Sequence, residues 1–372
     1  MIIATSKFNN PYIPEFKGIE KLEGKMLHSS QYRNAEAFKN KIVAVVGGSL
    51  SGTSIAEELA KITQVYHFIR KPRWIIGRYR SSDPKNNGPL LPRDLLKTYA
   101  SSLTKLSPEE EYEFMLQHCA EQNEIPEWCM KPDSPIGFVV ADDYLSLLRS
   151  GNLQPIRGNI DYFSESKLIL EDERSFNFDV IIFCTGYFRD LTFLPENLRL
   201  RSALYEDTFP PGTENIAFIG MYPEARGAVF PLIELQAKLA CAVFSNRYQL
   251  PSTETMLAEI ASMPSSRNEV AFTSSLATRL GVIPELKSLS PDLCHILVNG
   301  AYTPARFLLN TQPELAITTI KETEYYRRKL LHSKDKIPSL SSLCFFKLQS
   351  LQIEKATQDD NRPGGSKVIG AL

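Results

Sequence analysis

The residues best suited to chemistry in this sequence lie in one short glycine-rich turn. The stretch VVGGSLSG, at residues 45–52, has the spacing of a G-x-G-x-x-G turn, with Gly47, Ser49 and Gly52 at its three key positions. In such a turn the first glycine makes the bend, the second lets the backbone approach a pyrophosphate, and the third lets helix and strand pack closely. Backbone amides at the start of the following helix favour a bound anion. The candidate phosphate cradle therefore comprises Gly47, Gly48, Ser49, Leu50, Ser51 and Gly52.

The elements on either side of the turn are those that a nucleotide site needs. Residues 41–46 form an apolar run typical of a strand buried on both faces of a parallel sheet. Residues 53–62 have apolar positions at helical spacing, and residues 65–69 form a second apolar run. The order strand, turn, helix, strand completes a βαβ unit of about 30 residues. This context favours a dinucleotide site over a purely structural glycine turn.

The segment after the second strand bears on which dinucleotide binds. An NAD site usually has an acidic residue about 20 residues after the glycines, whereas cations there accommodate the 2′-phosphate of NADP. This chain has Arg70, Lys71 and Arg73, and no acidic residue occurs among residues 70–80. The competing interpretation is a solvated basic loop. Together with the upstream turn, the cations favour NADP(H).

Further elements follow a mixed α/β pattern. Ser107, Pro108 and Glu110 form a capping-box sequence, which predicts a helix to about residue 122. Short strands are expected around residues 160–163, 167–170, 179–183 and 216–220. A further helix is expected to begin at Pro231 and run to about residue 244. The tail from about residue 338 is rich in Ser, Lys and Gln, and its end is expected to be disordered.

Composition excludes several classes of function. Forty-two Lys and Arg balance 43 Asp and Glu, so no global field draws the chain to nucleic acid or to an anionic membrane. The six cysteines show no paired spacing, and the five histidines form no metal-ligand or triad pattern. His67 lies within a strand, where a core or satisfied histidine is expected. No run of 18 apolar residues and no signal-peptide pattern occur, so no transmembrane segment is expected and a cytoplasmic location is the default.

Residues 22–32 carry the first of several motifs that point to one family. Gly24, His28 and Tyr32 have the spacing of the fingerprint F-x-G-x-x-x-H-x-x-x-W, with Leu22 for Phe and Tyr32 for Trp. Residues 4–14 are similar to A-T-G-x-x-x-x-P-x-x-P, with Ser6 for glycine, and residues 183–187 (FCTGY) are similar to F-A-T-G-Y. Further matches lie at residues 216–221, 234–244 and 300–307. Over residues 2–320 the chain thus resembles the flavin-containing monooxygenases, relatives of the Baeyer–Villiger monooxygenases.

This resemblance implies an enzyme with two cofactors. NADPH would reduce FAD, O2 would form a flavin hydroperoxide, and one oxygen atom would pass to a soft nitrogen or sulfur nucleophile of a small molecule. The cofactor carries such chemistry, so no catalytic side chain has to stand out, and the catalytic residues are unknown. A pyridine nucleotide–disulfide reductase is disfavoured, because the chain has no Cys-x-x-Cys pair. A homo-oligomer is compatible with the sequence, which does not indicate oligomeric state.

Family motifs also assign residues to the two cofactors. Residues 47–52 with Arg70, Lys71 and Arg73 would hold NADPH, although position 50, usually Asn in the family, is Leu50 here. The flavin side would comprise Gly186, Tyr187, Gly220, Met221 and Gln236. His28 and Tyr32 would fall in an interdomain linker, where a hinge or packing role is favoured over direct chemistry.

The implied fold is α/β, with two interleaved Rossmann-like dinucleotide-binding domains. An NADPH domain is expected at residues 36–178 and a FAD domain at residues 1–35 and 179–330, followed by an extension at residues 331–372. The family opens with its own glycine-rich βαβ unit for FAD, which these residues lack, so the FAD domain is expected to be incomplete at its N-terminus. Three alternatives remain: a truncated monooxygenase, a chain completed by another polypeptide, or a degenerate NADP-binding protein without oxygenase activity.

Overall fold

The computed structural model describes residues 1–5, 8–81, 90–92, 98–103, 106–134, 137–165, 167–199, 204–221, 229–263 and 268–331. Ser6 and nearly all of the predicted C-terminal extension lie outside these residues. The chain divides into two compact units. Unit 1 comprises Met1–Lys7, Tyr79–Lys105 and Leu191–Leu372, and unit 2 comprises Phe8–Arg78 and Leu106–Asp190.

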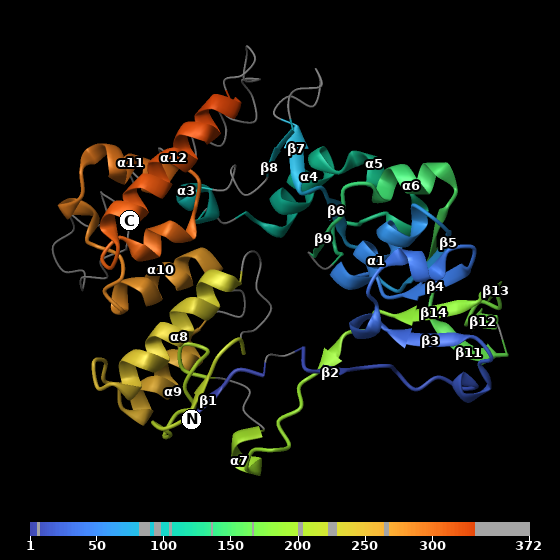
Figure 1. Ribbon diagram of the computed structural model, residues 1–372, viewed down its shortest axis with the longest axis horizontal. Coiled ribbons are helices and arrows are strands. Elements are labelled where there is room, and N and C mark those ends of the chain that lie inside the picture. The colour runs from blue at the N-terminus through green and yellow to red at the C-terminus, as the bar shows by residue number, and fades with distance from the viewer. Residues whose placement is uncertain are drawn as a thin grey trace. The chain divides into compact units, whose positions relative to one another are not determined.

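Unit 2 is built on a five-stranded sheet in which all the strands are parallel (Figure 1). Its strand order is β10-β5-β4-β14-β3. The strands are β3 (Lys25–His28), β4 (Ile42–Val46), β5 (Gln64–Ile69), β10 (Leu153–Arg157) and β14 (Val180–Phe183). Residues of β4 and β14 are almost all buried, as expected of a parallel sheet covered on both faces. The predicted α/β class is confirmed.

Each face of this sheet packs against a separate hydrophobic cluster. On one face α1 (Leu50–Ala60) and α6 (Tyr144–Ser150) pack over Val43, Val45 and Ile182. On the other face lies an antiparallel three-stranded sheet formed by β11 (Ile160–Ser164), β12 (Lys167–Leu170) and β13 (Ser175–Asn177). The layers are therefore helix, parallel sheet and antiparallel sheet.

Smaller elements complete unit 2. The predicted helix after Ser107 forms with its capping box, since Ser107 Oγ accepts from the Glu110 N–H and Glu110 accepts from the Ser107 N–H. It ends near Cys119, so the expected single helix is divided. The remaining helices and strands are α4 (Pro108–His118), α5 (Ala120–Asn123), a parallel pair β6 (Trp74–Ile76) and β9 (Phe138–Val140), and an antiparallel pair β2 (Asn10–Pro11) and β15 (Tyr187–Phe188).

Unit 1 is mainly helical. In the described part of this unit the strands form two short pairs, a parallel one between β1 (Ile2–Ile3) and β16 (Ala217–Phe218) and an antiparallel one between β7 (Tyr79–Ser81) and β8 (Leu90–Pro92). The strand predicted at residues 216–220 is therefore shorter than expected. The helix predicted from Pro231 is confirmed as α8 (Phe230–Phe244). The other α-helices described in this unit are α3 (Tyr99–Leu103), α7 (Glu196–Arg199), α9 (Thr253–Ser262), α10 (Glu269–Arg279), α11 (Pro291–Asn299) and α12 (Pro313–Leu331).

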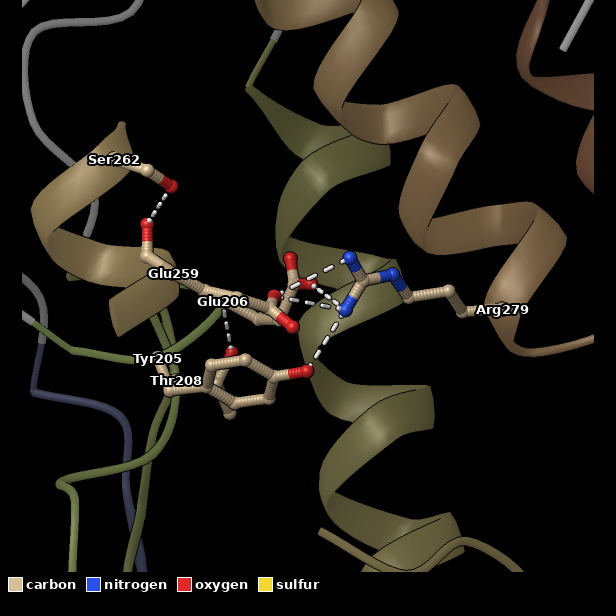
Figure 2. Close-up of polar contacts among 6 residues, drawn as sticks. All are labelled: Tyr205, Glu206, Thr208, Glu259, Ser262 and Arg279. Carbon is tan, nitrogen blue, oxygen red and sulfur yellow. Dashed lines mark hydrogen bonds and ion pairs between the residues drawn. The ribbon is translucent and has the colours of Figure 1, made fainter. Parts of the chain in front are cut away.

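Two arginines hold distant segments of unit 1 together. The Arg279 guanidinium contacts the carboxylates of Glu206 and Glu259 and donates to the Tyr205 hydroxyl (Figure 2). Arg306 is buried, and its guanidinium carbon lies 4.8 Å and 4.5 Å from the ring centroids of Tyr99 and Tyr302. These contacts fix the loop before β16 and helix α3 against the C-terminal helices.

The predicted cofactor domains do not follow the boundaries of these units. Strands β3 and β14 come from ranges expected to belong to the FAD domain, yet both lie in the sheet that contains β4. Residues 79–105, expected within the NADPH domain, belong to unit 1. The assignment of a cofactor to each range stays a prediction. Among the described residues, no helix combines the length and apolarity needed to cross a membrane.

Candidate dinucleotide-binding site

The glycine turn lies at the carboxyl end of β4, where α1 begins. Gly47 has φ +129°, and a Cβ added there would lie 2.4 Å from the Cys184 carbonyl oxygen. A Cβ added to Gly52 would lie 1.7 Å from the Gly47 carbonyl oxygen. A real Cβ cannot approach a backbone oxygen so closely, so the bend needs glycine at both positions. Strand, tight turn and helix therefore have the arrangement of a phosphate-binding turn.

The turn contains a row of backbone N–H groups that have no acceptor among the described residues. Hydrogen bonds of α1 begin with the Thr53 N–H, which donates to the Ser49 carbonyl, and no acceptor is found for the amides of residues 48–52. Ser49 is the N-cap, but its side chain makes no capping hydrogen bond and is exposed. Unpaired amides at the N-terminus of an 11-residue helix suit an anion. The residues present therefore fit the phosphates of a dinucleotide.

The predicted cations follow the neighbouring strand. Strands β4 and β5 are parallel, with Val46 opposite Phe68. The segments that follow the two strands therefore leave the sheet at the same end. The Lys71 backbone oxygen lies 3.5 Å from the position of a Gly48 Cβ, which places this segment beside the turn.

Among the described residues, neither Arg70, Lys71 nor Arg73 forms an ion pair, whereas Arg78 is engaged with Asp142 at 2.6 Å. Arg70 and Lys71 are exposed. The Arg73 guanidinium lies close to Gly137, where an added Cβ would be 2.6 Å from its Nη1. Arg70 and Lys71 are thus the cations most open to a phosphate.

His67 lies next to the turn with no exposed surface. Its Nε2 is 2.9 Å from the Gly47 carbonyl oxygen and its Nδ1 is 2.6 Å from the Tyr144 hydroxyl. Burial lowers the pKa of His67 to about 4, although the hydrogen bond to Gly47 opposes this shift. The ring is therefore neutral at pH 7. This confirms the expectation of a satisfied core histidine.

His28 lies at the end of β3 and joins two segments of unit 2. Its Nδ1 accepts the Ser30 N–H, so its Nε2 carries the proton and donates to the Gly186 carbonyl at 2.9 Å. Its ring packs edgewise on Tyr187, with centroids 4.9 Å apart. Burial lowers the pKa of His28. The histidine of the motif therefore orders the backbone around Gly186.

The other two motif residues also make packing contacts. A Cβ added to Gly24 would lie 3.0 Å from the Asp179 carbonyl oxygen, where β3 and β14 begin side by side. Tyr32 stacks on Phe38, with ring centroids 5.7 Å apart. Burial and the nearby Glu58 carboxylate raise the pKa of Tyr32. The stacking on Phe38 agrees with the hinge or packing role expected of Tyr32, which stays a prediction.

A cavity of about 490 Å³ adjoins His28. Its lining is formed by Pro11, Ile13, His28, Ser30 and Gln31. This lining combines the apolar side chains of Pro11 and Ile13 with imidazole, hydroxyl and amide groups.

The residues predicted for the flavin side fall into two groups. Gly186 and Tyr187 belong to unit 2, whereas Gly220, Met221 and Gln236 belong to unit 1. No atom lies within 4 Å of the position of a Gly186 Cβ, so its backbone is open to a ligand. The buried Gln236 side chain accepts from the Gly220 N–H at 2.9 Å and donates to the Asp207 carbonyl at 3.1 Å.

Gln236 therefore links the Gly220 N–H to the Asp207 carbonyl through the two ends of its side-chain amide. Met221, the residue that follows Gly220, is buried in a hydrophobic cluster with Ile3 and Phe218. Among the described residues, no group of three or more His, Cys, Asp or Glu is arranged to hold a metal ion.

Comparisons with known proteins agree on one family. A family model described as flavin-binding monooxygenase-like matches residues 1–321. Flavin-containing monooxygenase 5 of Rattus norvegicus is 30% identical over 367 residues, which cover 90% of this chain and 67% of the relative. Dimethylaniline monooxygenase [N-oxide-forming] 2 of Oryctolagus cuniculus is 30% identical over 313 residues, covering 75% of this chain and 56% of the relative. The chain thus spans roughly two thirds or less of these relatives.

A solved structure resembles the fold as well. The open crystal structure of cyclohexanone monooxygenase superposes with a TM-score of 0.51 and 15% sequence identity, covering 69% of this chain and 66% of that one. At this identity the likeness shows the fold alone.

Proposed function

This chain belongs to the flavin-binding monooxygenase-like family, among the class B flavoprotein monooxygenases, and on that premise we propose that it acts in an NADPH- and FAD-dependent monooxygenation. The reaction would transfer one oxygen atom from O2 to a soft nitrogen or sulfur nucleophile of a small molecule. The observation that carries the NADPH part is the row of amides at residues 48–52 beside Arg70 and Lys71, for which no hydrogen-bond or ion-pair partner is found among the described residues.

Each part of NADPH has a group of matching chemistry. The pyrophosphate would accept hydrogen bonds from the amides of residues 48–52 and from the Ser49 hydroxyl. The 2′-phosphate would pair with Arg70, Lys71 and Arg73, because charge-assisted hydrogen bonds to phosphate are the strong ones. No acidic side chain occurs among residues 70–80 to repel it.

FAD, when bound, supplies the oxygen chemistry, which protein side chains alone do not provide. The protein would orient the cofactor through backbone fixed by two buried side chains. His28 holds Gly186 through its carbonyl, and Gln236 holds Gly220 through its N–H. Both glycines have positive φ, and the closest atom to a Cβ at Gly220 is Ile233 Cδ1 at 4.0 Å. Both therefore leave room for close approach of a ligand.

Replacing Arg70 and Lys71 together with alanine is expected to weaken NADPH binding by about a hundredfold or more, since each charged hydrogen bond contributes about 1.5–3 kcal/mol and about 1.4 kcal/mol is a factor of ten. NADH lacks the 2′-phosphate, so its binding should change by less than about twofold. Titration of the purified protein with both nucleotides measures this. Arg149→Ala, which removes an exposed arginine paired with Glu121, is the matched control. Equal weakening of NADPH and NADH would contradict the assignment.

One observation favours a second candidate, a non-catalytic NADP-binding protein of the same fold. Leu50, 53% exposed, is an apolar side chain at the start of α1, where the family usually has Asn. It offers no hydrogen bond to a nucleotide.

An absorbance spectrum from about 300 to 550 nm separates the two candidates, because oxidised flavin absorbs at about 450 nm, where protein and NADPH do not. The purified chain is mixed with FAD, freed of excess cofactor and given NADPH under air. A retained flavin spectrum that bleaches with NADPH is the result expected of the monooxygenase. A colourless protein that binds NADPH would support the second candidate.

A further inference from the structure

The glycine turn is held from inside the protein by a buried pair of side chains, Tyr144 and His67. Tyr144 is the first residue of α6, and His67 lies in β5 opposite Val45 of β4. Both side chains are fully buried. Trp128 packs edgewise on Tyr144, with ring centroids 5.5 Å apart. The pair is therefore fixed by dense packing, as expected of a well-ordered core.

The directions of the hydrogen bonds in this pair follow from the groups present. A backbone carbonyl can only accept, so His67 Nε2 must carry the proton that it donates to the Gly47 oxygen. A neutral imidazole has one proton, so Nδ1 accepts from the Tyr144 hydroxyl. Tyr144 thereby selects the tautomer of His67 that can donate to Gly47.

The Gly47 carbonyl is coupled to the amide that faces outward. In a trans peptide unit the C=O of one residue and the N–H of the next point in opposite directions. No cis peptide bond occurs in the described chain. The Gly47 oxygen points toward His67 and lies against Gly52, on the inner side of the turn. The Gly48 N–H therefore points away from both residues. His67 is the donor found for this oxygen among the described residues.

We propose that His67 is a positioning residue for dinucleotide binding, which acts with Tyr144 to fix the Gly47–Gly48 peptide so that its N–H faces the pyrophosphate. This inference rests on the NADPH site proposed above. It adds a supporting residue, His67, that is not part of the glycine motif. His67 itself does not touch the ligand. Its loss would leave the Gly47 carbonyl without its donor and free the peptide to rotate.

Binding of two ligands distinguishes a loss of orientation at the Gly47–Gly48 peptide from a general loss of the folded binding site. NADPH contains the pyrophosphate, whereas adenosine 2′-monophosphate carries the adenine, the ribose and the 2′-phosphate without it. Binding of both is measured by calorimetric titration for the full chain and three variants. Tyr144→Phe removes one oxygen atom, His67→Leu removes the donor, and Tyr66→Phe is the matched control. Tyr66 lies in the same strand but packs on the opposite face of the sheet, against Phe176.

For NADPH, a loss of about tenfold is expected in His67→Leu, because a buried carbonyl is left unpaired, and about threefold in Tyr144→Phe. Adenosine 2′-monophosphate should bind all variants within about twofold of the unmodified chain, and Tyr66→Phe should bind both ligands normally.

Unchanged NADPH binding in Tyr144→Phe and His67→Leu would overturn the proposal, as would an equal loss of both ligands. If His67→Leu does not fold, Tyr144→Phe decides alone, and NADPH binding equal to that of the unmodified chain overturns the proposal. If the unmodified chain binds no NADPH, the proposed function fails and this inference fails with it. Normal NADPH binding with unaffected variants overturns only this inference.

Discussion

Replacing Gly52 with alanine is expected to lower the free energy of unfolding by about 2–3 kcal/mol and to weaken NADPH binding by about a hundredfold. Alanine is the better helix former by about 1 kcal/mol, so helix propensity alone predicts the opposite sign. The new Cβ would lie 1.7 Å from the Gly47 oxygen and 2.8 Å from the Gly47 carbonyl carbon. Both atoms are backbone, so the turn itself must move, and steric strain outweighs propensity.

Urea unfolding and NADPH titration check this result. Ser54→Ala is the matched control, because Ser54 lies two residues further along the same helix, outside the cradle, and is exposed. It should keep normal stability and nucleotide binding. A stable Gly52→Ala variant with normal NADPH affinity would contradict the close approach of helix and turn.

Replacing Arg279 with methionine should lower the free energy of unfolding by about 3 kcal/mol. The guanidinium lies 2.8 Å from Glu206, whose side chain is only 6% exposed, and it also donates to the Tyr205 hydroxyl. Its loss leaves the Glu206 charge in a buried position without this arginine. Removing one partner of a buried pair costs more than the pair itself contributes.

The second acid of the network provides the control. Glu259 lies 3.3 Å from Arg279 and its side chain is 37% exposed (Figure 2). Glu259→Gln should therefore cost less than about 1 kcal/mol. The double variant Arg279→Met/Glu206→Gln should recover part of the loss, because the buried charge is then absent. Denaturant unfolding at pH 7 measures all three, and equal costs for Arg279→Met and Glu259→Gln would be evidence against a buried pair.

Local patterns were sufficient to predict the strand–turn–helix–strand unit. A short apolar run, a glycine turn and helical spacing each depend on neighbouring residues, and they correspond to β4, α1 and β5. The ends of the helices were predicted less accurately. The helix predicted from Thr53 begins at Leu50, because Ser49 already adopts an extended N-cap conformation. The helix predicted to residue 122 is divided at Cys119, where φ is −131°.

Contacts between distant residues could not be predicted. His28 binds Gly186, 158 residues away, and His67 binds Tyr144, 77 residues away. The sequence shows His67 as a polar residue within an apolar strand, but its partner depends on where α6 packs. The family motif drew attention to Gly24 and His28 without indicating that residues 25–28 form an edge strand of the sheet.

The strand order of unit 2 dictates how the chain can assemble during synthesis. Strands β4, β5 and β10 are neighbours in the sheet and emerge from the ribosome in that order. Strand β3 emerges before them, but it pairs with β14 and has no pairing partner in the sheet until residues 180–183 have been made. Strand β14 then adds to the open edge of β4, and β3 pairs along the other side of β14. A ribosome that stalls before residue 180 therefore holds a chain whose β4 edge is still open to pairing with another chain.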